Sequence, residues 1–191
     1  MFLPFIQVFF AIFGVMDQVG NVPTFLSLTA KLDPKAQQKM GASAVWRAGI
    51  ILVVFIFLGS AILNVFQISI ESFRIAGGLI LCLLGLQILF GPEREARDGE
   101  GADISVVPLA TPLIAGPGTI TSAVILVKEY GYLMVLAAVV INLLLSRLLF
   151  KYSYLVLRLL GKKGAQAFAK VMGLIIVAIG VEFIRNALGT H

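Results

Sequence analysis

Long apolar segments follow one another along almost the whole chain, with few charges inside them. Of the 191 residues, 59% are hydrophobic and only 13% are charged, about half the charge of a soluble domain. In a bilayer every backbone polar group must be paired within the protein, so only helices and closed barrels span it. The segments lack the alternation of polar and apolar residues typical of barrel strands. The sequence therefore predicts an all-α integral membrane protein.

Six segments are near or above the roughly 20 residues that cross the hydrocarbon core as a helix. We expect six transmembrane helices at about 3–30, 43–64, 70–90, 104–127, 131–151 and 166–188. They form a single transmembrane domain over residues 1–191. Its parts are repeat one at about 1–90, a polar cytoplasmic linker at about 91–103 and repeat two at about 104–191.

The basic residues are distributed unevenly between the loops. Twelve of the fifteen Lys and Arg residues lie in the first, third and fifth loops or their flanks. Cytoplasmic loops carry such an excess, so we expect these loops in the cytoplasm and both termini on the extracytoplasmic side. No basic run is interleaved with aromatic residues on a polar surface, so we expect the lipid bilayer as a partner and no nucleic acid.

A weak internal repeat appears when the sequence is shifted by 95 residues. The matched pairs include Thr24 with Thr119, Phe73 with Phe168, Gly78 with Gly173, and Gly85 with Gly180. Each half has three spans, an odd number, so the second half must enter the membrane in the opposite sense. The sequence predicts two inverted-topology three-helix repeats. Gly78 and Gly85 are seven residues apart and so lie on one face of their helix, and the same holds for Gly173 and Gly180. We expect these four glycines to let helices pack closely.

Two apolar segments are interrupted at matching positions of the two halves, at residues 17–23 and 111–118. Proline and glycine in both stretches prevent a continuous helix. We expect helices 1 and 4 to be broken near the membrane midplane. A pair of interrupted segments in corresponding positions is the best sequence pointer to a transporter's binding site.

The first break carries a carboxylate about 21 Å into its helix, where a charge must face protein or water. Two roles for Asp17 stay open: a structural cap, or contact with a substrate or coupling ion. Gly20, Asn21 and Pro23 favour irregular backbone here and predict carbonyl groups without helical partners. The helix is expected to resume near Pro23 and Thr24, with its free N–H groups facing the break.

The second break repeats this arrangement, with the helix expected to resume near Thr119. Gly116 and Gly118 leave room for close approach of the backbone. Together the two breaks suit a small zwitterion, with N–H groups for a carboxylate and carbonyls for an ammonium. No catalytic or metal-binding residue is expected, and the candidate substrate-binding residues are Asp17, Gly20, Asn21, Pro23, Thr24, Ala115, Gly116, Pro117, Gly118 and Thr119.

In four stretches the chain resembles the MarC/SnatA family of integral membrane proteins, within the LysE-like transporter group. These stretches are residues 17–23, 106–118, 159–164 and 171–175. The resemblance implies a six-helix protein of the prokaryotic inner membrane that transports small neutral amino acids such as glycine or alanine. The first motif departs from the family, because Gln18 stands where the family usually has proline.

The resulting hypothesis is a secondary transporter that works by alternating access around a midplane site. The alternative is a cation or metal-ion transporter on the same scaffold. We expect no enzymatic activity, because no deep Ser/His or Asp/Asp pair is present. We expect no cofactor, with a proton or a sodium ion as the candidate coupling ion, and the sequence leaves a homo-oligomer open.

Overall fold

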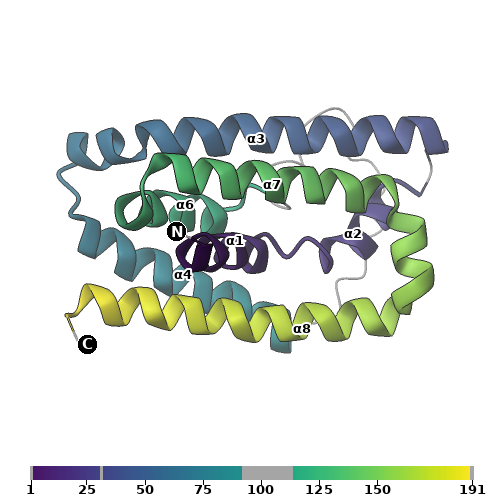
Figure 1. The fold of residues 1–191 in the computed structure, drawn as a ribbon. Coiled ribbons are helices and arrows are strands. Elements are labelled where there is room, and N and C mark those ends of the chain that lie inside the picture. The colour runs from purple at the N-terminus through teal and green to yellow at the C-terminus, as the bar shows by residue number, and fades with distance from the viewer. Residues whose placement is uncertain (1, 31, 92–113, 190–191) are drawn as a thin grey trace.

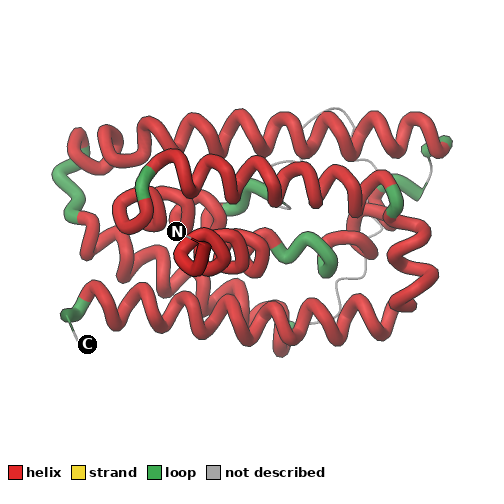
Figure 2. The backbone as a smooth tube through the Cα atoms, in the orientation of Figure 1, coloured by secondary structure: helices red, strands yellow, loops and turns green. Residues whose placement is uncertain are grey.

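The computed structural model describes residues 2–30, 32–91 and 114–189, and in these residues the chain is helical without strands (Figure 2). The expected linker at 91–103, except Gly91, and residues 104–113 of the fourth expected span lie outside the described residues. The helices are α1 (Phe2–Met16), α2 (Asn21–Leu28), α3 (Pro34–Val65), α4 (Ile70–Phe90), α6 (Pro117–Tyr130), α7 (Tyr132–Lys151) and α8 (Ser153–Ala187).

Side chains cap the starts of α3 and α4. The Asp33 side chain accepts a hydrogen bond from the Ala36 N–H at 3.3 Å, and Pro34 occupies the first turn of α3. Ser69 accepts from the Ser72 N–H at 3.0 Å at the start of α4. Inside α8, Gly161 has φ 68° and ψ 167°, so the helix bends at a residue that only glycine suits well.

Four helices are long and apolar enough to cross a membrane, namely α3, α4, α7 and residues Lys163–Ala187 of α8. The pair α1 and α2 counts as a fifth span, bent by 42° at the break. The all-α class and the break in the first span are therefore confirmed in the described residues. Helix α6 has only 14 residues, so the sixth span stays a prediction.

The helices form two outer layers with three shorter helices between them (Figure 1). Helices α3 and α7 pack along one side, and α4 and α8 along the other. Helices α1, α2 and α6 lie between these layers. Because α6 is enclosed from several directions, all of its residues 118–127 except Ile120 are buried. Helices α1, α2 and α6 are thus held between the two layers (Figure 1).

Helices α4 and α8 cross at four glycines. A Cβ atom added to Gly78 would lie 2.5 Å from the Gly180 carbonyl oxygen, and one added to Gly180 would lie 2.6 Å from that of Gly78. A Cβ atom on Gly85 would lie 2.6 Å from the Gly173 carbonyl oxygen. The two backbones touch because neither carries a side chain there, so the packing role predicted for these glycines is confirmed.

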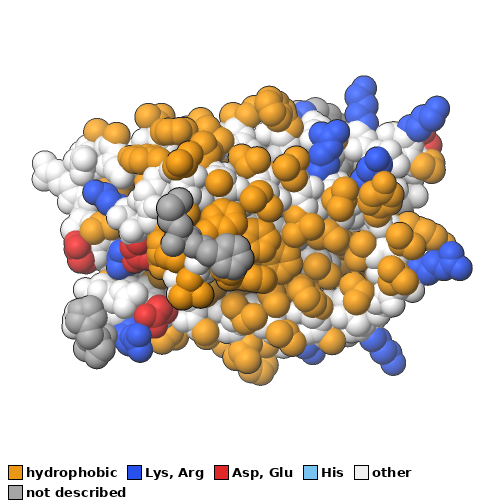
Figure 3. Space-filling view, viewed as in Figure 1, with side chains coloured by type: hydrophobic (Ala, Val, Ile, Leu, Met, Phe, Trp, Pro, Cys, Tyr) orange, Lys and Arg blue, Asp and Glu red, His pale blue; other side chains and the backbone are white. Residues whose placement is uncertain are grey.

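The surface is apolar around the middle and charged at both ends (Figure 3). Large apolar side chains such as Leu133 and Phe90 are more than 80% exposed, as expected for contact with lipid. Lys and Arg gather at the end that holds the α7–α8 joint, the basic end (Figures 1 and 3). Two ion pairs, Arg74–Glu129 at 2.6 Å and Arg185–Glu182 at 2.8 Å, lie at the opposite end.

Candidate functional site

The break between α1 and α2 is a tight turn at Asp17, whose φ is 43°. Asp is among the few non-glycine residues that adopt positive φ with some frequency. The Asn21 N–H donates to the Asp17 carbonyl at 3.0 Å, and the Asn21 side chain donates to the Met16 carbonyl at 2.9 Å. The expectation of carbonyls without helical partners is therefore wrong for Asp17, whereas the Met16 carbonyl accepts from a side chain instead of a helical N–H, and each oxygen retains a second lone pair.

Glycine at position 20 leaves room for the Asp17 carboxylate, which folds back onto it. A Cβ atom on Gly20 would overlap that carboxylate, with its Cγ atom only 2.7 Å away. Helix α2 begins at Asn21, two residues before the expected start. Pro23 is then its third residue, where a missing N–H leaves no helical hydrogen bond unmade. The proline thus lies within the first turn of α2 instead of opening the helix.

Helix α6 begins at Pro117, also two residues before its expected start at Thr119. Proline suits the first helical position because its φ is already helical. Gly116 precedes it in an extended conformation with no side-chain cap. A Cβ atom on Gly118 would lie 2.9 Å from Leu81 Cδ2, so glycine lets the start of α6 approach α4. The N–H groups of Gly118 and Thr119 have no acceptor within the helix.

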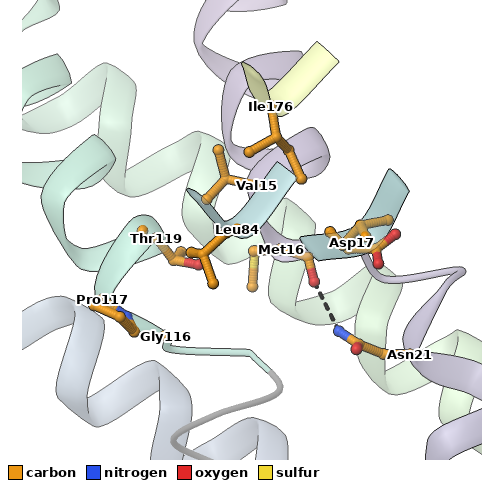
Figure 4. Close-up of a pocket in the computed structure, with 11 residues that line it drawn as sticks. Val15, Met16, Asp17, Asn21, Leu84, Gly116, Pro117, Thr119 and Ile176 are labelled. Carbon is orange, nitrogen blue, oxygen red and sulfur yellow. Dashed lines mark hydrogen bonds between the residues drawn. The ribbon is translucent and has the colours of Figure 1, made fainter. Parts of the chain in front are cut away.

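The break and the start of α6 meet at one cavity of about 70 Å³. Figure 4 shows Asp17 and Asn21 on one side of it and Gly116, Pro117 and Thr119 on the other. At roughly 10–15 Å³ for each water-sized group, the cavity has room for about five heavy atoms. Its complete wall is Val15, Met16, Asp17, Asn21, Leu84, Ile88, Gly116, Pro117, Gly118, Thr119 and Ile176.

A second cavity of about 140 Å³ adjoins the first and shares Asp17 and Ile88 with it. Of the ten candidate residues, Asp17, Asn21, Gly116, Pro117, Gly118 and Thr119 line the first cavity. Gly20, Pro23 and Thr24, together with Asp17, line the second. Ala115 lines neither of these cavities and is buried in the apolar core.

Sequence reasoning missed the walls that α4 and α8 supply. Leu84, Ile88 and Ile176 enclose the first cavity, and nothing distinguishes them from other apolar residues of these helices. Gln87 and Gln166 line the second cavity. A polar amide within an apolar segment was a usable signal for both residues.

Gln18 points away from both cavities, toward α7. Its Nε2 atom donates to Asn142 Oδ1 at 2.8 Å and to the Asn142 carbonyl at 3.2 Å. Asn142 Nδ2 in turn donates to the carbonyls of Ala138 at 2.9 Å and Phe9 at 3.3 Å. Asn142 therefore joins α7 to α1. These buried amides fasten both the middle and the broken end of α1 to α7.

Replacing Gln18 by leucine should destabilise the protein by about 1–3 kcal/mol, because buried polar groups of Asn142 lose their partner. The matched control is Gln7→Leu, the same change on the exposed face of α1. Thermal unfolding of the purified protein in detergent measures the difference. If Gln18→Leu and Gln7→Leu unfold at the same temperature, the amide pair does not hold α1 in place.

The fold and its surface define a class: a multi-pass α-helical protein of the lipid bilayer. A family model described as MarC family integral membrane protein matches residues 2–191. The chain therefore belongs to the MarC family, and the predicted resemblance is confirmed.

Relatives cover almost the full length of the chain. The UPF0056 membrane protein of Archaeoglobus fulgidus is 36% identical, over 96% of this chain and 92% of its own. YhcE of Escherichia coli, also named a UPF0056 membrane protein, is 33% identical over 96% and 91%. YvbG of Bacillus subtilis is 32% identical over 98% and 95%. No solved structure gives a significant match.

Proposed function

We propose that this protein is a secondary transporter of small neutral amino acids, with its binding site in the cavity between the α1–α2 break and the start of α6. The observation that carries the proposal is that both interrupted segments contribute to the wall of one cavity. Irregular backbone at membrane depth is tolerated where it lines a cavity, and transporter sites use such helix ends.

The chemistry of the wall supports a zwitterionic substrate. The amino-terminal end of α6 presents N–H groups and the positive end of a helix dipole, which favour a carboxylate. Across the cavity, the Asp17 carboxylate favours an ammonium group. The apolar side chains of Leu84 and Ile176, with a volume of about 70 Å³, favour glycine or alanine over larger amino acids.

The α4–α8 crossing supports the two inverted repeats, residues 1–90 and 104–191, within a single domain. The shift of 95 residues pairs Gly78 with Gly173 and Gly85 with Gly180. The contact between Gly78 and Gly180 therefore corresponds, under this repeat, to the contact between Gly173 and Gly85. Residues 95 apart also meet directly, since Cys82 Sγ lies 3.8 Å from the Val177 carbonyl oxygen. Both relations are expected of a two-fold axis that passes between α4 and α8.

On this proposal the basic end faces the cytoplasm and both termini face outward, in the inner membrane of a prokaryote. Helices of different repeats pack against each other in two pairs, and this pairing constrains how the site opens. Because α4 packs on α8 and α3 on α7, helices of both repeats move together. Alternating access then takes place between the broken helices and these paired layers, driven by a proton or sodium gradient.

Flux of radiolabelled glycine into proteoliposomes tests the proposal. We expect saturable uptake that alanine inhibits and that phenylalanine does not, because phenylalanine exceeds the cavity. Imposed proton and sodium gradients, applied separately, identify the coupling ion. Absence of saturable uptake under every gradient would contradict the proposal. Cation flux without competition by any amino acid would favour the ion transporter instead.

A further inference from the structure

The second cavity differs from the first in size, polarity and position. It has about twice the volume, near 140 Å³ against 70 Å³. It lies between α2, the carboxyl-terminal end of α4 and α8, toward the basic end of the bundle. Its wall is Asp17, Gly20, Pro23, Thr24, Gln87, Ile88, Gly91, Ala165, Gln166, Ala169 and Lys170.

Opposite charges contribute to this wall. Asp17, which is 7% exposed, is shared with the first cavity, so its carboxylate lies where the two cavities adjoin. Lys170 is exposed and belongs to α8. Between these charges the wall offers the Thr24 hydroxyl and the side-chain amides of Gln87 and Gln166. These groups can pair with both charged groups of a zwitterion.

We propose that the second cavity is a separate binding site for amino-acid zwitterions, an access site on the basic side of the first. This proposal rests on the proposed function. Lys170 attracts the carboxylate at the mouth of the cavity, and Asp17 receives the ammonium at the junction with the first cavity. The greater volume accepts amino acids that the first cavity rejects, so selection for size occurs at the passage past Asp17 and Ile88.

Kinetics of charge variants test the role of Lys170. Lys170→Gln should raise the KM for glycine presented at the basic end about twofold to fivefold, as for an exposed charge, with the maximal rate unchanged. Lys170→Arg should restore the KM. The matched control is Lys163→Gln, an exposed lysine of the same helix that does not line the cavity. Equal KM values for the two glutamine variants would overturn the proposal.

Cysteine labelling tests the cavity without relying on flux. Ala169→Cys and Gln166→Cys should react with a membrane-impermeant thiol reagent from the basic side only, and excess glycine should slow the reaction. Val171→Cys, on the exposed apolar face of α8, is the control and should stay unlabelled. Labelling from the opposite side, or no protection by glycine in a protein that transports glycine, would overturn the proposal. Failure of glycine flux in the wild type would instead overturn the proposed function.

Discussion

Asp17→Asn is expected to lower glycine flux about 10- to 100-fold while leaving the protein folded. Losing one charge-assisted hydrogen bond to the ammonium group costs about 1.5–3 kcal/mol, which corresponds to that range. The fold should persist because Asn adopts positive φ as readily as Asp, and Asp17 has φ 43°. Initial rates in proteoliposomes measure the effect.

The control for this variant is Glu182→Gln, which removes an exposed carboxylate paired with Arg185 on the surface of α8. Both variants should unfold at temperatures close to that of the wild type, so that a difference in flux reflects the site. An Asp17→Asn protein that transports glycine within twofold of the wild-type rate would show that Asp17 is a structural cap alone.

Gly78→Ala should destabilise the protein by forcing α4 and α8 apart. The added Cβ would lie 2.5 Å from the Gly180 carbonyl oxygen, a backbone atom that cannot rotate away. Overpacking of this kind costs about 1–3 kcal/mol, and for a protein of this size each kcal/mol lowers the melting temperature by about 2–4 °C. Thermal unfolding in detergent measures the shift.

Gly14→Ala provides the matched control. Gly14 is also buried in a helix, but the nearest atom to its added Cβ would be Ile175 Cγ2 at 3.6 Å, an ordinary contact. Alanine also favours the helix over glycine, so the melting temperature should stay equal or rise slightly. If both variants melt together, α4 and α8 do not depend on the contact between their backbones.

The helical class and the location of the first break could be predicted because both follow from local chemistry. Apolar length specifies a membrane helix, and glycine with proline at residues 17–23 interrupts it. The restart of each broken helix was misplaced by two residues. Pro23 was expected to open its helix and Pro117 to precede one, whereas Pro23 is the third residue of α2 and Pro117 the first of α6, both within a first turn, where helices tolerate proline.

The direction of side chains at the break could not be predicted, because it depends on one turn and on a distant helix. Positive φ at Asp17 sends Gln18 toward Asn142, 124 residues away in sequence. The sequence alone shows only that Gln18 stands where the family usually has proline. In the structure it fastens α1 to α7, and the polar wall of the cavity comes from other residues.

The second cavity could not be predicted for a related reason. Its wall joins α2, α4 and α8, and only the packing of the folded chain brings Thr24, Gln87 and Lys170 around one space. The internal repeat relates the two breaks to each other, but it does not predict whether each break faces the layer of α3 and α7 or the layer of α4 and α8. The internal repeat therefore locates the interrupted segments, whereas the position of the cavities can be known only from the folded structure.

The central claim is that both interrupted segments bind one small zwitterion, and a structure of the protein with glycine in a lipid nanodisc tests it most directly. The account predicts glycine between the two segments, with its carboxylate at Thr119 on the start of α6 and its ammonium toward Asp17. Glycine bound away from either segment, or a first span that runs unbroken through residues 17–20, would contradict it.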